Sequence, residues 1–365
     1  MTVANVGSIL FGLALLVVGA QFLVRNASKL ALTLGISPLV VGLTIVAFGT
    51  SAPELAVSIQ SCLSNNTNIV LGNVVGSNIY NVLFILGLCA AISPLTVAPQ
   101  LIRMDVPLMI CASALLYGLA FDGRLSRLDA AVLACAIVAY TIFVIVQSKK
   151  EEKGVEAEYE KDLKESLEQP ETRKWLLVLL IVVGLVLLSY GSDLLVGGAV
   201  GIAKALGLSD LIIGMTIVTI GTTAPEISAC LVASFRGEGD IAVGNIVGSN
   251  LFNILGVLGV GGLVAKDGIA VDPGMLGFAI PVMVAVAFSC LPIFFAGHRI
   301  ARWEGLLFLA YFAFYMLHLI LEAMNDTRLQ ALRSLVLWYV VPLTVITLIV
   351  SVWRQVKSGR TAASA

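Results

Sequence analysis

The stretch VGLTIVAFGTSAPE, residues 41–54, is an apolar run that ends on small and polar residues and then on the acid Glu54. The pattern returns at residues 213–226 as IGMTIVTIGTTAPE. At the same offset of 172 residues, GNVVGSNIYN (72–81) returns without a gap as GNIVGSNLFN (244–253). The matches fall on Gly, Thr, Pro, Glu, Asn and Ser, which packing alone does not demand. The chain therefore contains a duplicated half.

Composition indicates a membrane protein. The chain has 365 residues, of which 59% are hydrophobic and 12% charged, and its mean hydropathy is +1.00. A bilayer core takes about 20 apolar residues per helix, and backbone groups in lipid must be satisfied within the segment, so helices are expected. The apolar runs give eleven candidate spans, near residues 5–24, 37–63, 69–91, 104–121, 128–147, 175–196, 209–235, 241–264, 275–296, 303–321 and 335–353. We predict an all-α polytopic membrane protein.

A charged stretch at residues 149–174 divides the chain, with five spans before it and five between it and residue 322. An odd number of spans per copy makes the second copy enter the bilayer from the opposite side, so the two copies form an inverted pair. Residues 335–353 have no partner in the first half and predict an eleventh span. The predicted units are a first repeat (1–148), a charged cytoplasmic linker (149–174), a second repeat (175–322) and a C-terminal span with its tail (323–365).

The distribution of charge predicts the orientation. With the N-terminus outside, 16 of the 22 Lys and Arg residues fall in cytoplasmic loops and the tail, seven of them in the linker. The positive-inside rule therefore places the N-terminus outside and the C-terminus in the cytoplasm. The first apolar run lacks the basic start and cleavage site of a signal peptide, so it counts as a span. We expect a multi-pass protein of the inner (plasma) membrane.

The two glutamates are predicted to be functional. A charged residue inside a bilayer costs at least about 2.5–3.5 kcal/mol, and such residues mark ion pathways. Each glutamate follows a proline, which removes a backbone N–H and disfavours helical geometry before it, so each helix should break there and free carbonyl oxygens. Hydroxyls three and four residues earlier share a helix face with the acid. The two sets are Thr50, Ser51 and Glu54, and Thr222, Thr223 and Glu226.

A second polar stripe follows in each copy, because its members are spaced by four residues. The stripes are Asn73, Ser77 and Asn81, and Asn245, Ser249 and Asn253. Neighbouring glycines allow helices to approach closely. Together the stripes and the acids predict a cage of hard oxygen ligands, which suits Ca²⁺ with its six to eight oxygens at about 2.3–2.6 Å. Na⁺ has nearly the same radius, and shared ligands would make occupancy by the two ions mutually exclusive.

The paired Gly-Thr-(Ser/Thr)-Ala-Pro-Glu and Gly-Asn-x-Val-Gly-Ser-Asn-x-x-Asn motifs resemble the alpha repeats of the calcium/cation antiporter superfamily, specifically its sodium/calcium exchanger branch. The similarity covers residues of about 15–88 and 187–260. It implies a bundle of ten spans in which Na⁺ entry displaces Ca²⁺ while the first and sixth helices slide against the core. The eleventh span departs from that pattern.

The resemblance also implies roles for single residues. It assigns Ca²⁺ binding and a share of Na⁺ binding to Glu54 and Glu226. It assigns Na⁺ ligation to hydroxyls and backbone oxygens at Ser51, Thr223, Ser77, Ser249, Thr50, Thr222, Ala47 and Thr219. Two positions depart from the family pattern: Asn253 stands where potassium-dependent exchangers carry Asp, and Thr223 replaces the usual Ser. A potassium requirement is therefore not expected.

Three other functions are alternatives to Na⁺/Ca²⁺ exchange. A Ca²⁺/H⁺ antiporter shares the fold and the acids, but that branch tends to have Asn where this chain has Thr50-Ser51 and Thr222-Thr223. An intramembrane protease would need paired catalytic Asp or Ser/His residues, and a passive channel suits a closed acidic cage less well than a transporter does. No enzyme activity, cofactor or nucleic-acid partner is expected, and the predicted partners are Ca²⁺, Na⁺ and the lipid bilayer.

Other polar residues receive structural interpretations. The six cysteines are scattered singly through apolar runs, which is typical of small buried hydrophobic residues. Four acids near span ends favour interfacial anchors or helix caps over ion sites: Asp105, Asp129, Asp193 and Asp210.

Overall fold

The structure is a computed structural model that describes residues 3–64, 67–164, 174–205, 219–324 and 326–347, together with Ile349. In this part of the chain nearly every residue is helical, and nine helices are long and apolar enough to cross a membrane. The count becomes ten when one bent pair of helices is taken as a single span. The prediction of an all-α polytopic membrane protein is confirmed.

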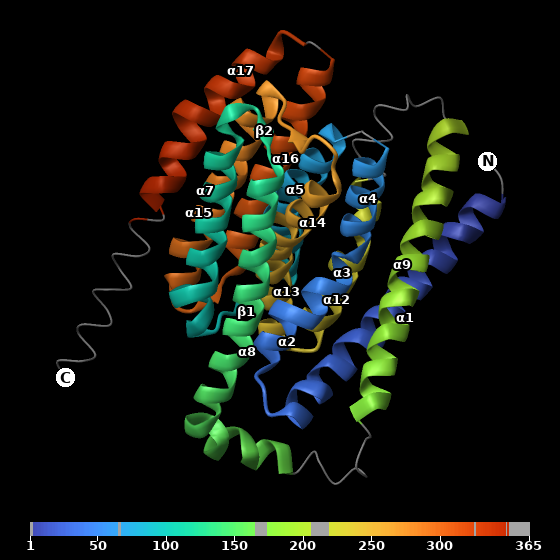
Figure 1. The fold of residues 1–365 in the computed structure, drawn as a ribbon, viewed down its shortest axis with the longest axis vertical. Coiled ribbons are helices and arrows are strands. Elements are labelled where there is room, and N and C mark those ends of the chain that lie inside the picture. Colours follow the sequence, from blue (N-terminus) through green and yellow to red (C-terminus); the bar gives the residue numbers. More distant parts are fainter. Residues whose placement is uncertain are drawn as a thin grey trace.

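The first half consists of α1, the bent pair Pro38–Thr50 and Ala52–Leu63, and three further long apolar helices (Figure 1). Several spans contain a π-turn, labelled η. In chain order the elements are α1 (Val3–Leu34), α2 (Pro38–Val41), η1 (Gly42–Val46), α3 (Ala47–Thr50), α4 (Ala52–Leu63), α5 (Asn68–Tyr80), η2 (Asn81–Leu86), α6 (Gly87–Ile92), β1 (Leu95–Thr96), η3 (Leu101–Asp105), α7 (Val106–Leu119), the 3₁₀ turn η4 (Ala120–Asp122), β2 (Arg124–Leu125) and α8 (Arg127–Lys164).

The second half repeats this order as far as it is described. Its elements are α9 (Lys174–Ala205), α11 (Thr219–Thr222), α12 (Ala224–Phe235), α13 (Gly239–Leu251), η6 (Phe252–Val257), α14 (Leu258–Val264), β3 (Ile269–Ala270), η7 (Met275–Ala279), α15 (Ile280–Phe295), β4 (Arg299–Ile300), α16 (Arg302–Ala323), α17 (Arg328–Leu335) and η8 (Val336–Val340). Residues 209–218 of the predicted span 209–235 lie outside the described residues, as do residues 165–173 of the linker.

The C-terminal helix begins before the predicted span 335–353. It runs from Arg328 to Thr347 and packs on α16, where the Tyr311 hydroxyl donates to Thr344 Oγ1 at 2.7 Å. In Figure 1 it lies on the outside of the bundle. Whether it crosses the bilayer as an eleventh span stays a prediction.

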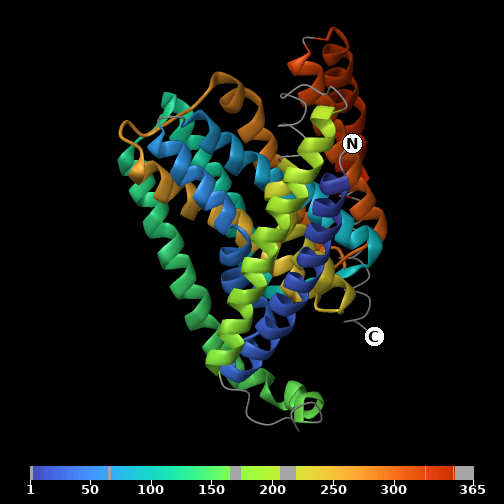
Figure 2. The same ribbon diagram turned by 90° about the vertical axis from the view of Figure 1, so that its right-hand side faces the viewer.

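Helices α1 and α9 lie side by side in both views (Figures 1 and 2). Gly12 faces Gly191 and Gly19 faces Gly184, so residue numbers rise along one helix as they fall along the other, and the helices are antiparallel. A Cβ atom on Gly12 would lie 2.6 Å from the Gly191 carbonyl oxygen. The offset of 172 turns Gly12 into Gly184 and Gly191 into Gly19, so the two contacts are each other's counterparts. This reciprocity is what an inverted pair of copies produces.

Two short strand pairs show the same exchange between the halves. β1 pairs with β4, with Leu95 opposite Ile300, and β2 pairs with β3, with Arg124 opposite Ala270. In each pair one strand comes from each half. The number of spans per repeat stays a prediction, because residues 206–218 are not described.

The centre of the bundle is formed by α13 with η6 and α14, and by α5 with η2 and α6. In the most apolar window of Gly239–Val264, 83% of the residues are buried, and in that of Ile69–Ile92 72%, against 28% for the window in α1. Both central spans carry the Gly-Asn-x-Val-Gly-Ser-Asn motif. The polar stripes are therefore in the core of the protein and not on its lipid face.

The glycine contacts between α1 and α9 generate a prediction about stability. The substitution Gly12→Ala should lower the midpoint of thermal unfolding in detergent, because its Cβ has no room beside Gly191 and overpacking costs about 1–3 kcal/mol. Gly7→Ala, on the same helix and with open space around it, is the control and should leave the midpoint unchanged or raise it, because Ala favours helix over Gly by about 1 kcal/mol. Equal midpoints for the two variants would contradict this packing.

Candidate ion-binding site

The predicted helix break is present in the first copy. The segments Pro38–Thr50 and Ala52–Leu63 meet at an angle of 43° at Ser51. Ser51 has φ −84° and ψ 7°, and Thr223, at the matching position of the second copy, has φ −89° and ψ 1°. The same non-helical backbone therefore precedes both Ala-Pro-Glu sequences, and each glutamate lies in the first turn of the helix that follows.

Each proline leaves a carbonyl four residues earlier without its helical partner. In the second copy this is the Gly221 carbonyl, and the Ser192 hydroxyl of α9 donates to it. Hydroxyl side chains commonly satisfy backbone groups freed by proline in membrane helices. In the first copy the matching carbonyl is that of Gly49, and Ala20 stands where Ser192 would be. The two breaks therefore share a backbone shape but differ in their surroundings.

Side chains at the breaks bond across the two copies. Ser51 Oγ donates to Glu226 Oε1 at 3.3 Å, and Thr50 Oγ1 donates to Asn245 Oδ1 at 3.2 Å. Glu54 is 1% exposed and Glu226 is 2% exposed, so both acids are enclosed by protein. The hydroxyls of the first copy thus meet the acid and the amide of the second copy. Thr222 is half-buried, and Thr223 is fully buried.

Several buried oxygens of the repeated motifs have no hydrogen-bond partner. They are Glu54 Oε2, Glu226 Oε2, Asn81 Oδ1, Asn253 Oδ1 and Ser249 Oγ. Leaving a buried acceptor unsatisfied costs about 1–3 kcal/mol, and more for a charged group. No group of three or more His, Cys, Asp or Glu side chains suited to a metal is present among the described residues. A cation bound here would therefore use two carboxylates together with amide and hydroxyl oxygens.

The first asparagine of each motif makes a matching contact. Asn73 Nδ2 donates to Ser58 Oγ and to the Glu54 carbonyl, both at 3.3 Å. Asn245 Nδ2 donates to Cys230 Sγ at 3.2 Å. Ser58 and Cys230 hold the same position in the two copies, one helical turn after each glutamate. The Nδ2 atoms of Asn73 and Asn245 thus each bond within their own half. The Oδ1 atom of each side chain is then turned toward the centre of the bundle.

Backbone geometry also changes at the second pair of motif asparagines. The π-turn η2 begins at Asn81, and η6 contains Asn253. Single π-turns within α-helices often occur at functional sites. Asn78 and Asn250, three residues earlier, hydrogen-bond to these asparagines across the bundle. Both residues belong to the repeated motif, but no role was predicted for them from the sequence. Their equivalent positions in the two copies are the sequence feature that could have indicated one.

Of the two predicted backbone ligands, Ala47 is described in full and Thr219 is not. The Ala47 carbonyl accepts from the Ser51 N–H at 3.1 Å, and Thr50 Oγ1 lies 3.4 Å from it. Thr219 begins α11, but its side chain lies outside what the structure describes. The predicted hydroxyls of Ser77 and Ser249 are both buried in the central spans.

Four acids were predicted to be interfacial anchors or helix caps, and Asp129 and Asp105 differ in whether they fit that prediction. Asp129 caps its helix by accepting from the Ser126 N–H at 2.8 Å, in agreement with the prediction. For Asp105 the prediction is wrong, because this residue is fully buried and makes no capping bond, and it accepts from the Tyr140 hydroxyl at 3.1 Å. Its position near a span end in the sequence did not indicate that α8 covers it. Asp193 is exposed, and Asp210 lies outside the described residues.

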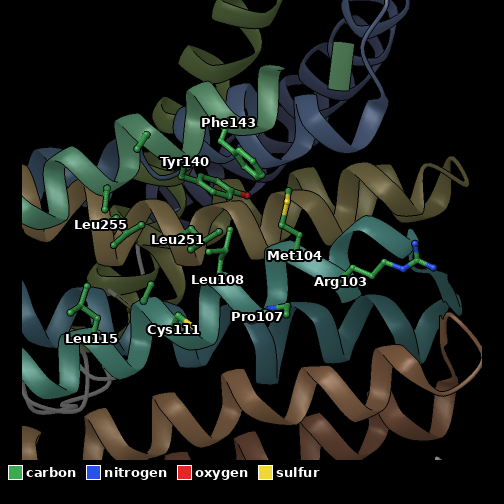
Figure 3. A pocket seen from close by; sticks show the side chains of 13 residues that line it. Arg103, Met104, Pro107, Leu108, Cys111, Leu115, Tyr140, Phe143, Leu251 and Leu255 are labelled. Atoms are coloured by element: carbon green, nitrogen blue, oxygen red, sulfur yellow. The ribbon is translucent and has the colours of Figure 1, made fainter. Parts of the chain in front are cut away.

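A groove of about 790 Å³ lies between α7 and α8, and Leu251 of the second motif also lines it (Figure 3). Its lining is mainly apolar, with Leu108, Leu115 and Phe143 among the side chains drawn, and Arg103 stands at one end. No carboxylate lines it. The groove therefore lacks the negative charge that a cation site in a bilayer requires.

Comparison with known proteins agrees with this geometry. The family model described as sodium/calcium exchanger protein matches residues 4–147 and 176–321. CaxA of Alkalimonas amylolytica is 39% identical over 84% of this chain and 96% of its own length. The sodium/calcium exchanger MaX1 of Methanosarcina acetivorans is 32% identical over 87% of this chain and 98% of its own length.

Among solved structures, the sodium-calcium exchanger NCX_Mj soaked without Na⁺ and Ca²⁺ matches with a TM-score of 0.72 and 30% sequence identity. The match covers 85% of this chain and 97% of that one. The fold, the duplicated motifs and the family match lead to one conclusion. The chain is an integral membrane protein that belongs to the sodium/calcium exchanger family.

Proposed function

We propose that the protein exchanges Na⁺ for Ca²⁺ by alternating access at a site formed by Glu54 and Glu226. The observation that carries the proposal is the set of buried, unpartnered oxygens contributed by the same motif positions of both copies. Two carboxylates balance the charge of one Ca²⁺, and the amide and hydroxyl oxygens raise the ligand number toward the six to eight that Ca²⁺ takes. Mg²⁺ fits less well, because it keeps its waters and demands an octahedron.

Competition between the two ions follows from shared ligands. Ser51 Oγ already bonds Glu226, so a Na⁺ that takes this hydroxyl and one carboxylate oxygen removes a ligand from Ca²⁺. The hydroxyls at Ser51, Thr223, Ser77 and Ser249, with Thr50 and Thr222, are the proposed Na⁺ ligands. Backbone oxygens at Ala47 and Thr219 are proposed to assist. The relatives' names support this substrate pair, since MaX1 and NCX_Mj are both named as sodium/calcium exchangers.

A Ca²⁺/H⁺ antiporter is the second candidate, because a proton can also neutralise a buried carboxylate. The hydroxyls favour Na⁺, since a proton on a glutamate needs no further oxygen ligands. Thr50 and Ser51 both donate hydrogen bonds into the second copy at the acid site. A site built for proton exchange alone would not require these groups.

Alternating access requires one part of the protein to move against another, and α1 with α9 is the proposed moving part. The glycine contacts hold these two helices backbone to backbone. They join the core through apolar packing, with Leu23 and Val24 of α1 fully buried, and through hydrogen bonds from Ser28 of α1 to Glu238 and from Ser192 of α9 to the Gly221 carbonyl. Because backbone contacts hold the two helices to each other while side chains join them to the core, we propose that the pair slides as a unit.

The topology around this site is also proposed. Residues 1–148 and 175–322 form the two inverted repeats, residues 149–174 form a cytoplasmic linker, and residues 323–365 add a span and a tail. The excess of basic residues in the linker and tail favours an N-terminus outside and a C-terminus in the cytoplasm.

Flux measurements test the ion pair. Proteoliposomes loaded with Na⁺ and diluted into Na⁺-free buffer with Ca²⁺ should take up Ca²⁺, because outward Na⁺ movement supplies the driving force. Vesicles with equal Na⁺ on both sides are the control and should show little uptake. Uptake that follows an imposed pH gradient and ignores Na⁺ would transfer the assignment to the proton branch.

The role of the acids is tested by Glu54→Gln and Glu226→Gln. Each should abolish Ca²⁺ transport while the protein stays folded, because the amide keeps the shape and removes the charge. Glu304→Gln is the matched control: Glu304 is also buried in a span, but it accepts from the Ala301 N–H at 2.7 Å, far along the chain from the motifs. Full activity in either motif variant would place the site elsewhere.

Ion binding should also stabilise the folded protein. Ca²⁺ at one hundred times its dissociation constant should add about 2.7 kcal/mol, seen as a higher midpoint of thermal unfolding in detergent. Added Na⁺ should reduce the Ca²⁺ effect by competition. The stabilisation should disappear in Glu54→Gln and persist in Glu304→Gln. A Ca²⁺ effect of equal size in both variants would mean that the ion binds outside the cage.

A further inference from the structure

Four asparagines form a reciprocal set of hydrogen bonds at the centre of the bundle. Asn78 Nδ2 donates to the Asn250 carbonyl at 3.2 Å, and Asn250 Nδ2 donates to the Asn78 carbonyl at 3.4 Å. Asn81 Nδ2 donates to Asn250 Oδ1 at 3.0 Å, and Asn253 Nδ2 donates to Asn78 Oδ1 at 3.2 Å. Every bond in the set joins one copy to the other.

The direction of each amide follows from the acceptors around it. A backbone carbonyl can only accept, so Asn78 and Asn250 must turn their nitrogens toward each other's main chain. Their side-chain oxygens can then only accept, so Asn81 and Asn253 must supply nitrogens. The side-chain oxygens of Asn81 and Asn253 are thereby turned away from the set, where they are buried and have no partner.

Methionine sulfur atoms lie beside the amide nitrogens of Asn78 and Asn250. Asn250 Nδ2 lies 3.5 Å from Met109 Sδ, and Asn78 Nδ2 lies 3.7 Å from Met283 Sδ. Both polar atoms of Asn78 and of Asn250 are thus engaged within the protein. The side-chain oxygens of Asn81 and Asn253, in contrast, have no partner.

We propose that Asn78 and Asn250 are positioning residues that aim the side-chain oxygens of Asn81 and Asn253 at the transported cation. The inference rests on the proposed function and deepens it. An amide that rotates freely would present its NH₂ group to the ion about as readily as its oxygen, and a fixed amide avoids that loss. Because the bonds are reciprocal, each copy orients the ligand of the other.

The set also explains why amides suit positions 81 and 253. An ionised carboxylate at Asn253 would bring an acceptor against Asn78 Oδ1, and neither atom could donate. The Asn78 amide could turn only by giving up its bond to the Asn250 carbonyl. The reciprocal bonds therefore disfavour an ionised carboxylate at position 253.

A double-mutant cycle on transport tests the proposal. Asn81→Ala removes the ligand, and we expect the KM for Ca²⁺ in proteoliposomes to rise about tenfold with little change in the maximal rate. Asn250→Ala removes the positioning group and should raise the KM by a similar factor. The double variant should be no worse than Asn81→Ala alone, because Asn250 acts through Asn81, and residues that share an interaction are not additive.

The mirror cycle with Asn78→Ala and Asn253→Ala must give the same result, and it decides the question if one variant of the first pair does not fold. Asn26→Ala is the control, because within the described part of the chain this buried asparagine bonds the Phe22 carbonyl of its own helix at 2.6 Å, and its KM should be unchanged. Additive effects in both cycles would overturn the positioning role and leave the proposed function standing. An unchanged KM in both Asn81→Ala and Asn253→Ala would remove these residues from the ion site itself.

Discussion

The structure depends on the enclosure of two carboxylates within a membrane protein. Glu54 and Glu226 are almost completely buried, and one oxygen of each has no partner in the protein. Two unpaired charges at that depth would oppose folding by several kcal/mol. The surrounding hydroxyls and amides reduce this cost only in part, since Ser51 bonds one oxygen of Glu226. In the proposed function a cation would complete the arrangement, and ion binding would then stabilise the core.

The backbone is adapted to the same constraint. Ser51 and Thr223 interrupt their helices with nearly identical dihedral angles, and π-turns occur at Asn81 and Asn253. An unbroken helix would use its carbonyls internally and would present only side chains. Breaks are tolerated at this depth because the exposed backbone lies inside the protein and not against lipid. The Ser192 hydroxyl on the Gly221 carbonyl is one example of how a neighbouring helix satisfies a freed group.

The α1–α9 pair and the central helices α5 and α13 are held together by different kinds of contact. Between α1 and α9, glycines bring backbones together, and a single added carbon atom would collide with the partner helix. Between α5 and α13, asparagines exchange hydrogen bonds across the copies and fix the direction of every amide. The first contact suits a pair of helices that moves as a unit. The second suits a rigid core that would keep the proposed ion ligands in place.

The sequence by itself determined the membrane class, the duplicated half, the two acids and the broken helix before Glu54, because these follow from hydropathy and from residues that repeat at a fixed offset. It did not determine which partners meet. A repeat shows that Asn78 and Asn250 are equivalent, but not that they bond each other, and Asp105 looked like a span-end residue until α8 was seen to cover it. Only the tertiary structure decided these pairings, because the direction of a hydrogen bond and the burial of a side chain depend on segments distant in the chain.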